Sequence, residues 1–154
     1  MQCSTKNNID LGGHWNVKLD KENTGISEKW YLEFQGEDIS LPGSLAENGF
    51  GDEIDTETKW IGQIVDSSWF TSEKYKKYRE ADNIKIPFWL QPESHFVGVA
   101  WYQKVVDIPA EWNYKNIHLY LERCHWETMV WIDSTFIGMQ NALATPHEYG
   151  LSEA

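Results

Sequence analysis

The stretch from Gly98 to Gly138 decides the fold, and it reads GVAWYQKVVDIPAEWNYKNIHLYLERCHWETMVWIDSTFIG. Three runs rich in Val, Ile, Leu, Trp and Tyr are separated by short polar segments, a pattern typical of consecutive β-strands. The first run predicts a strand over residues 99–108. Pro109 ends it, because proline has no N–H to donate to a strand ladder.

The second and third runs predict a strand over residues 117–124 and a hairpin that begins at Met129. In the second run, apolar and polar residues alternate, with Ile117, Leu119 and Leu121 on one face. The third run passes through the polar turn of residues 133–135 into a return strand at Phe136. The stretch therefore predicts an antiparallel sheet.

The chain before this stretch carries weaker strand signals. Alternation over residues 13–20 predicts a half-buried strand, and the turn signal Pro42-Gly43 follows a short strand over residues 38–41. Residues 44–92 predict long loops, with a helical turn or two over 72–81 and an edge segment over 84–90. We expect seven or eight strands and almost no helix, which is an all-β antiparallel sandwich or jelly roll.

Composition limits the classes of partner. The 154 residues carry 24 acidic and 13 basic side chains, a formal net charge of -11, which disfavours nucleic acid. No run of about 18 apolar residues is present, so no membrane span is predicted. The 9 Trp, 7 Tyr and 6 Phe suit half-buried strands and also the apolar faces of sugar rings.

The two cysteines predict no disulfide, because Cys3 lies near the chain terminus, where residues are seldom held in place. They predict no metal site either, because no Cys-x-x-Cys or Cys/His ligand spacing is present. Cys124 is expected to be a small buried hydrophobe. No signal peptide is evident at the start of the sequence. An alternative is that Cys3 and its polar tether form a lipid-anchored mature N-terminus, which would place the protein in the periplasm or outside the cell.

No catalytic site and no cofactor can be predicted from the residues. The acidic cluster of residues 52–57 lacks the order of a calcium loop, so a solvated loop is favoured over a cation site. The five histidines show no close ligand spacing and are expected to be surface or satisfied residues. Neither a nucleophile elbow nor a glycine-rich phosphate loop is present.

A set of short motifs, in one order along nearly the whole chain, resembles the N-terminal sugar-binding domain of family 2 glycoside hydrolases, the relatives of β-galactosidase, β-glucuronidase and β-mannosidase. The motifs are Gly13-His14-Trp15, Leu41-Pro42-Gly43-Ser44, Gly98-Val99-Ala100-Trp101-Tyr102, Leu119-Tyr120-Leu121-Glu122-Arg123, Val130-Trp131-Ile132-Asp133 and Thr145-Pro146-His147-Glu148-Tyr149. One departure is Ser134, which stands where the family usually has glycine in the hairpin turn.

The resemblance implies a galactose-binding-like jelly roll over residues 13–154 that follows a flexible segment over residues 1–12. It also implies a parent enzyme that retains anomeric configuration and carries both catalytic glutamates in a separate barrel, for which 154 residues leave no room. The expectation is therefore a non-catalytic domain, truncated at its C-terminal side, whose partners are a β-linked glycan and the other domains of the same enzyme.

Two alternatives remain open at this point. A free-standing carbohydrate-binding module would present exposed aromatic side chains, and a docking domain would brace its neighbours without contacting sugar. In the family, a loop before the strand of Trp101 reaches the substrate, and residues 88–96 occupy that place here. The candidate sugar contacts are Trp60, Trp69, Phe88, Trp89 and His95.

Three residues are predicted to be structural. Trp101 and Trp131 lie in core strands, and Arg123 is in register with Leu119 and Leu121 on the inner face. A buried guanidinium must be paired, so Arg123 is expected to hold the sandwich through hydrogen bonds. Sheet edges left open by a truncated domain would also favour self-association of the isolated chain.

Overall fold

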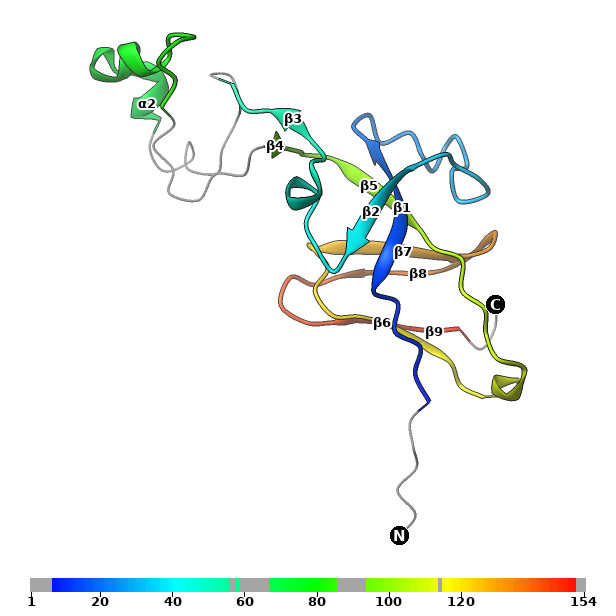
Figure 1. Ribbon diagram of the computed structural model, residues 1–154. Helices are drawn as coiled ribbons and strands as arrows, with labels where there is room; N and C mark the ends of the chain where they lie inside the picture. The colour runs from blue at the N-terminus through cyan, green and yellow to red at the C-terminus, as the bar shows by residue number, and fades with distance from the viewer. Residues whose placement is uncertain (1–6, 56–57, 59–66, 86–93, 114, 152–154) are drawn as a thin grey trace. The chain divides into compact units, whose positions relative to one another are not determined.

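The computed structural model describes residues 7–55, 58, 67–85, 94–113 and 115–151 (Figure 1). The sequence-based predictions for Cys3, Glu57, Trp60, Phe88 and Trp89, and the edge segment beyond residue 85, lie outside these residues. The described residues are mostly strands in antiparallel pairs with a few short helices. The predicted all-β antiparallel class is therefore confirmed.

Nine strands and four short helices make up the described part of the chain. In chain order they are β1 (Gly13–Asp20), β2 (Glu37–Leu41), η1 (Ala46–Asn48), β3 (Asp52–Glu53), α2 (Ser68–Thr71), η2 (Glu73–Tyr78), β4 (Ser94–His95), β5 (Val99–Gln103), η3 (Ala110–Trp112), β6 (His118–Leu121), β7 (Glu127–Ile132), β8 (Thr135–Asn141) and β9 (His147–Gly150).

The chain divides into two compact units. The first comprises Met1–His14 and Ile39–Val97, and the second Trp15–Asp38 and Gly98–Ala154. The prediction of one domain from residue 13 onwards stays a prediction.

Short elements build the first unit. β3 and β4 pair antiparallel, with Asp52 opposite His95. The predicted helical turns over 72–81 are present as η2, which follows α2 directly. The hydroxyl of Ser72 caps η2 by accepting a hydrogen bond from the N–H of Lys74 at 3.3 Å.

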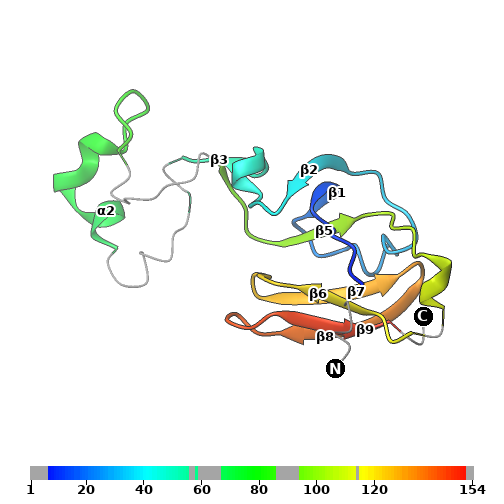
Figure 2. The ribbon, with the colours of Figure 1, turned by 60° about the horizontal axis from the view of Figure 1, so that its bottom comes forward.

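The second unit contains three antiparallel strand pairs. β1 pairs with β5, β6 with β9, and β7 with β8, and the last two pairs lie side by side in both views (Figures 1 and 2). The inner faces of two pairs meet where the rings of Trp101 on β5 and Trp131 on β7 approach to 5.2 Å between centroids. Val17, Trp101 and Tyr149 are buried, so this contact belongs to the core of the unit.

The predicted hairpin is confirmed as β7 and β8. Ile132 pairs with Thr135, which leaves a two-residue turn of Asp133 and Ser134. Asp133 has φ of 50°, whereas Ser134 does not have a positive φ. A type I′ turn needs positive φ at both positions, so this turn is not type I′, and the negative φ of residue 134 explains how a serine is accepted there.

The predicted strand over residues 99–108 is shorter than expected, because β5 ends at Gln103. Gln103 is opposite Asn16 at the end of its pairing with β1. A strand is defined by the partner that satisfies its N–H and C=O groups, and the run to Pro109 has none in a described sheet.

Candidate functional site

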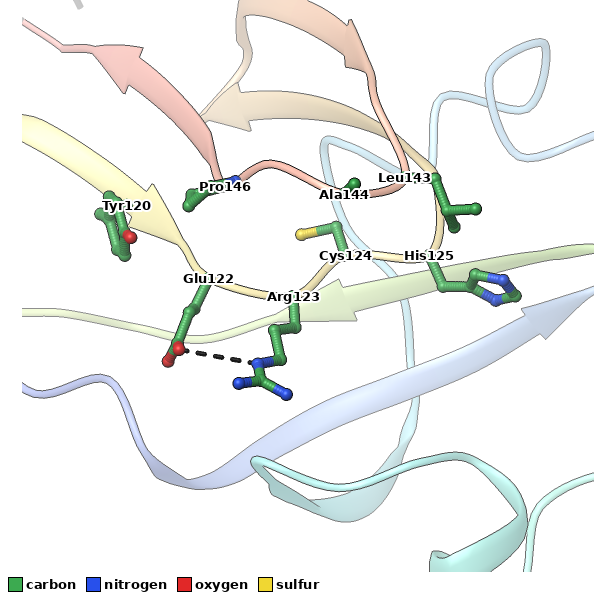
Figure 3. A pocket seen from close by; sticks show the side chains of 8 residues that line it. All are labelled: Tyr120, Glu122, Arg123, Cys124, His125, Leu143, Ala144 and Pro146. Atoms are coloured by element: carbon green, nitrogen blue, oxygen red, sulfur yellow. Dashed lines mark ion pairs between the residues drawn. The ribbon is translucent and has the colours of Figure 1, made fainter.

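A hollow of about 540 Å³ lies at one end of the β6–β9 pair in the second unit (Figure 3). Its lining combines an aromatic ring, an ion pair, a thiol, an imidazole and three apolar side chains. The lining residues are Tyr120, Glu122, Arg123, Cys124, His125, Leu143, Ala144 and Pro146.

The strand pairing explains why two distant segments form this hollow. Leu121, the last residue of β6, is opposite His147, the first residue of β9. The connection that leaves β6 and the connection that enters β9 therefore emerge at the same end of the pair. Residues 122–125 supply one wall and residues 143–146 the other.

Hydrogen bonds hold the two walls together. The N–H of Ala142 donates to the carbonyl of Trp126 at 3.0 Å. His147 is fully buried and its Nε2 lies 2.9 Å from the carbonyl oxygen of Ala142, while its Nδ1 lies 2.6 Å from the hydroxyl of Thr128 on β7. The hollow therefore rests on a fixed polar base.

Arg123 is on the outer surface, so its predicted place on the inner face is wrong. Its side chain is 89% exposed, and its Nε lies 3.6 Å from Oε1 of Glu122, which is 71% exposed (Figure 3). The alternation of Leu119 and Leu121 does not continue to Arg123 because β6 ends at Leu121. Such an exposed pair adds little to stability and leaves both charged groups available to a ligand.

Cys124 is half-buried rather than part of the core, so the prediction of a buried hydrophobe is also corrected. Burial raises the pKa of its thiol. A raised pKa keeps the sulfur protonated, and the thiol is the weak nucleophile of the two forms. The raised pKa disfavours the nucleophilic thiolate, and Cys124 lines the hollow as a thiol.

The chemistry of the lining suits the binding of a polar ligand with an apolar face. The Tyr120 ring is 58% exposed and can stack on such a face. The guanidinium of Arg123 supplies donors and the carboxylate of Glu122 supplies acceptors for hydroxyl groups. Among the eight lining residues Glu122 is the one carboxylate, whereas glycoside hydrolysis uses a pair.

The described aromatic candidate for sugar contact, Trp69, lies in the first unit. Its side chain is only 5% exposed, and its indole N–H donates to the carbonyl of Lys85 at 2.9 Å. A buried ring cannot stack on a sugar, so the candidacy of Trp69 as an exposed platform is wrong. His95 is half-buried in β4.

Among the described residues no group of three or more His, Cys, Asp or Glu side chains is placed to hold a metal ion. The described members of the acidic cluster, Asp52, Glu53 and Asp55, are exposed. The ring of His118 pairs with the carboxylate of Glu148 at 3.0 Å on the surface. In the described part of the chain no helix has the length and the apolar character that crossing a membrane requires.

Tyr120 is a lining residue that the sequence-based reasoning did not single out. The alternation of residues 117–121 does place it on the outer face of its strand. The partnership of β6 with β9, about thirty residues later, brings Pro146 beside it, and no local pattern signals that pairing.

The fold of the chain is that of one part of several β-glucuronidases. Against a crystal structure of the β-glucuronidase of Ruminococcus gnavus, 94% of this chain and 18% of that chain are covered, with a TM-score of 0.61 and 19% identity. A β-glucuronidase from an uncultured Clostridium species is covered over 19% of its length, with a TM-score of 0.57 and 17% identity. The chain thus spans less than a fifth of the length of these enzymes.

No family model matches the sequence, and no curated protein matches it. The R. gnavus enzyme is also described in complex with D-glucuronic acid and with uronic deoxynojirimycin, and the same share of this chain is covered. At identities below 20% these likenesses show a shared fold.

Proposed function

We propose that this chain is a non-catalytic β-sandwich domain of a family 2 type glycoside hydrolase acting on a β-linked sugar. The observation that carries the proposal is the fold likeness, which extends over 94% of this chain but only 18% of a β-glucuronidase. The motif order quoted above points to the same family. The parent enzyme would then perform the hydrolysis by double displacement, with a pair of carboxyl groups that lies in another of its domains.

Within this function, we assign the hollow at the end of β6 to contact with saccharide. Tyr120 would stack on one face of a sugar ring, while Glu122 and Arg123 would bond its hydroxyl groups. A single lining carboxylate supports binding without hydrolysis. Recognition of sugars by a ring and a few convergent polar groups is common in such depressions.

Two measurements on the purified chain test the proposal. Aryl β-glucuronide and aryl β-galactoside should not be turned over, and turnover that depends on Glu122 would overturn the non-catalytic role. Titration of methyl β-glucuronide and methyl β-galactoside by NMR should shift signals of residues around Tyr120. The Tyr120→Ala variant should abolish those shifts, whereas Phe136→Ala, an exposed aromatic control on β8, should retain them.

A docking role has its own supporting observation. Met129 and Met139 stand opposite each other on the β7–β8 hairpin and are 40% and 52% exposed, with Phe136 at 53% on the same hairpin. Flexible methionine side chains adapt to partner surfaces. If the hollow binds no sugar but Met139→Lys weakens attachment to the other domains of the enzyme, docking is the better description.

A further inference from the structure

A short segment of the first unit is positively charged within an acidic chain. Residues 73–85 hold five of the 13 basic residues and three of the 24 acidic residues, a net charge of +2. The other 141 residues therefore carry eight basic and 21 acidic residues, a net charge of -13. Such a local reversal of sign is a basis for attracting an anionic partner.

The side chains of η2 (Glu73–Tyr78) lie in three rows along the helix, and the rows differ in charge. A 3-10 helix has three residues per turn, so side chains three positions apart lie one above the other. Lys74 and Lys77 form one row and Tyr75 and Tyr78 another. The remaining row joins Glu73 to Lys76 through an ion pair of 3.7 Å, which neutralises that face.

A third lysine completes the surface. The N–H of Lys85 donates to the carbonyl of Tyr78 at 3.0 Å, which fixes the segment after η2 beside the helix. The ammonium groups of Lys77 and Lys85 lie 4.9 and 5.5 Å from the centroid of the Tyr78 ring. Lys74 lies 5.0 Å from the Tyr75 ring, and all three lysines are exposed.

The arrangement rests on a packed base. The guanidinium of Arg79 donates to the carbonyls of Trp69 and Ser72 and is thereby committed to holding α2 against η2. The buried indole of Trp69 donates to the carbonyl of Lys85 at 2.9 Å. Arg79 is therefore not free to bind a ligand. The remaining exposed cations and the two rings beside them form a preformed surface, which we call the lysine–tyrosine surface: Lys74, Lys77, Lys85, Tyr75 and Tyr78.

We propose that the lysine–tyrosine surface binds an anionic polysaccharide, with uronate carboxylates on the ammonium groups of Lys74, Lys77 and Lys85. This proposal deepens the carbohydrate role of the preceding section and rests on it for the choice of a saccharide. Ammonium–carboxylate pairs attract the polymer, and repeated weak contacts along it add up. Double-stranded nucleic acid is disfavoured because its charge density, about one charge per 1.7 Å of helix axis, exceeds that of a polymer with one carboxylate per sugar, so the -13 of the remaining residues repels it more strongly.

The test measures the affinity of the full 154-residue chain for polygalacturonate by calorimetry at 50 and 300 mM NaCl. The site variant is K74E/K77E/K85E. The control variant, K21E/K29E/K115E, makes the same change of net charge at three exposed lysines of the second unit. Far-UV circular dichroism and thermal unfolding establish that both variants fold, and K74Q/K77Q/K85Q serves in place of a site variant that does not.

We expect the site variant to bind polygalacturonate at least tenfold more weakly and the control to stay within about threefold of wild type. The higher salt concentration should weaken binding by the wild type, since screening reduces contacts between exposed charges. Equal losses in the site and control variants would overturn the proposal, because net charge alone would then explain binding.

Three further outcomes would also overturn it. In the first, the wild type binds an uncharged galactan as tightly as polygalacturonate. In the second, duplex DNA displaces polygalacturonate at a lower concentration of charge than polygalacturonate itself presents. In the third, the wild type binds no polymer but self-associates, and the site substitutions dissociate it. Binding of methyl β-glycosides at the hollow around Tyr120 is measured separately. Failure of that binding with retention of polygalacturonate binding would sink the proposed role of the hollow and leave the lysine–tyrosine surface in place.

Discussion

The indole nitrogen of Trp101 donates a hydrogen bond of 3.1 Å to Oδ2 of Asp20, across 81 residues of sequence. Both side chains are buried, and Asp20 is only 2% exposed. The same carboxylate accepts hydrogen bonds of 2.8 Å from the backbone N–H groups of Thr24 and Gly25. One acidic group therefore ties the loop after β1 to the central tryptophan of β5.

This arrangement lowers the pKa of Asp20. Burial alone would raise the pKa, but the hydrogen bonds from Thr24, Gly25, Trp101 and the backbone of Asn23 stabilise the ionised form and prevail. A carboxylate with a lowered pKa in the folded state stabilises the fold above its unfolded pKa. That contribution is lost as pH falls through the folded pKa.

Replacement of Asp20 by Asn should lower the free energy of unfolding by about 3 kcal/mol at pH 7, because an amide NH₂ would face the backbone donors and leave one of them unsatisfied. The difference between wild type and D20N should shrink as the pH falls below about 4, the ordinary pKa of an aspartate, because the wild-type carboxylate then also takes up its proton. Urea unfolding at pH 7, 4 and 2.5 checks this expectation. A difference that stays constant over this range would contradict the role of the charge.

Gly25 has no room for a side chain. A Cβ there would lie 2.3 Å from Nε1 of Trp101 and 2.8 Å from Oδ2 of Asp20. The Trp101 ring cannot withdraw easily, because it is buried and contacts the rings of Trp30 and Trp131. Gly25→Ala should therefore cost about 3 kcal/mol and disturb the tryptophan signals of near-UV circular dichroism.

The control for this change is Gly150→Ala on β9, where a Cβ would meet nothing within 4 Å. Because alanine is slightly better than glycine within a strand, this variant should be neutral or up to about 1 kcal/mol more stable. Equal effects of the two substitutions on the midpoint of urea unfolding would show that Gly25 is not constrained by the Asp20–Trp101 pair.

Patterns within a few neighbouring residues correctly predicted the β7–β8 hairpin and the face of β6 on which Tyr120 lies. The β7–β8 hairpin follows from two β-rich runs around a polar turn, and the outward face of Tyr120 follows from simple alternation. The number of strand-like runs separated by turn signals predicted the all-β class, and the motif order along the chain pointed to the same class.

Long-range pairing determined what the sequence could not show. Because β6 ends at Leu121, Arg123 does not continue the strand's alternation and is exposed. Because the pairing of β5 with β1 ends at Asn16 and Gln103, β5 is shorter than its apolar run predicts. The indole of the buried Trp69 donates to the carbonyl of Lys85, sixteen residues away. The sequence shows the charge of Arg123 and the aromatic character of Trp69. It does not show which distant strand or carbonyl group each segment pairs with, because alternation and turn signals extend over only a few neighbouring residues.

The polar base of the hollow gives a last prediction. Because the carbonyl of Ala142 only accepts, the tautomer that satisfies both contacts has its proton on Nε2 of His147, and Nδ1 then accepts from the hydroxyl of Thr128. The hydroxyl of Tyr149 lies 2.6 Å from the hydroxyl oxygen of Thr128 and 2.9 Å from the Thr128 carbonyl oxygen, and its single proton is shared between these two acceptors. Thr128 therefore connects β7 to two side chains of β9.

Thr128→Val keeps the shape of the side chain and removes its hydroxyl, which leaves the fully buried Nδ1 of His147 without a donor. We expect the free energy of unfolding to fall by about 2 kcal/mol. The same change at the exposed Thr135 of β8 should stay within about 0.5 kcal/mol of wild type. In a double-mutant cycle with Tyr149→Phe, the double variant should lose about 1 kcal/mol less free energy of unfolding than the sum of the two single losses, because both substitutions break the same hydrogen-bond network. Strict additivity of the two effects would mean that the Thr128 and Tyr149 hydroxyls act independently, and the connection between β7 and β9 would then rest on packing alone.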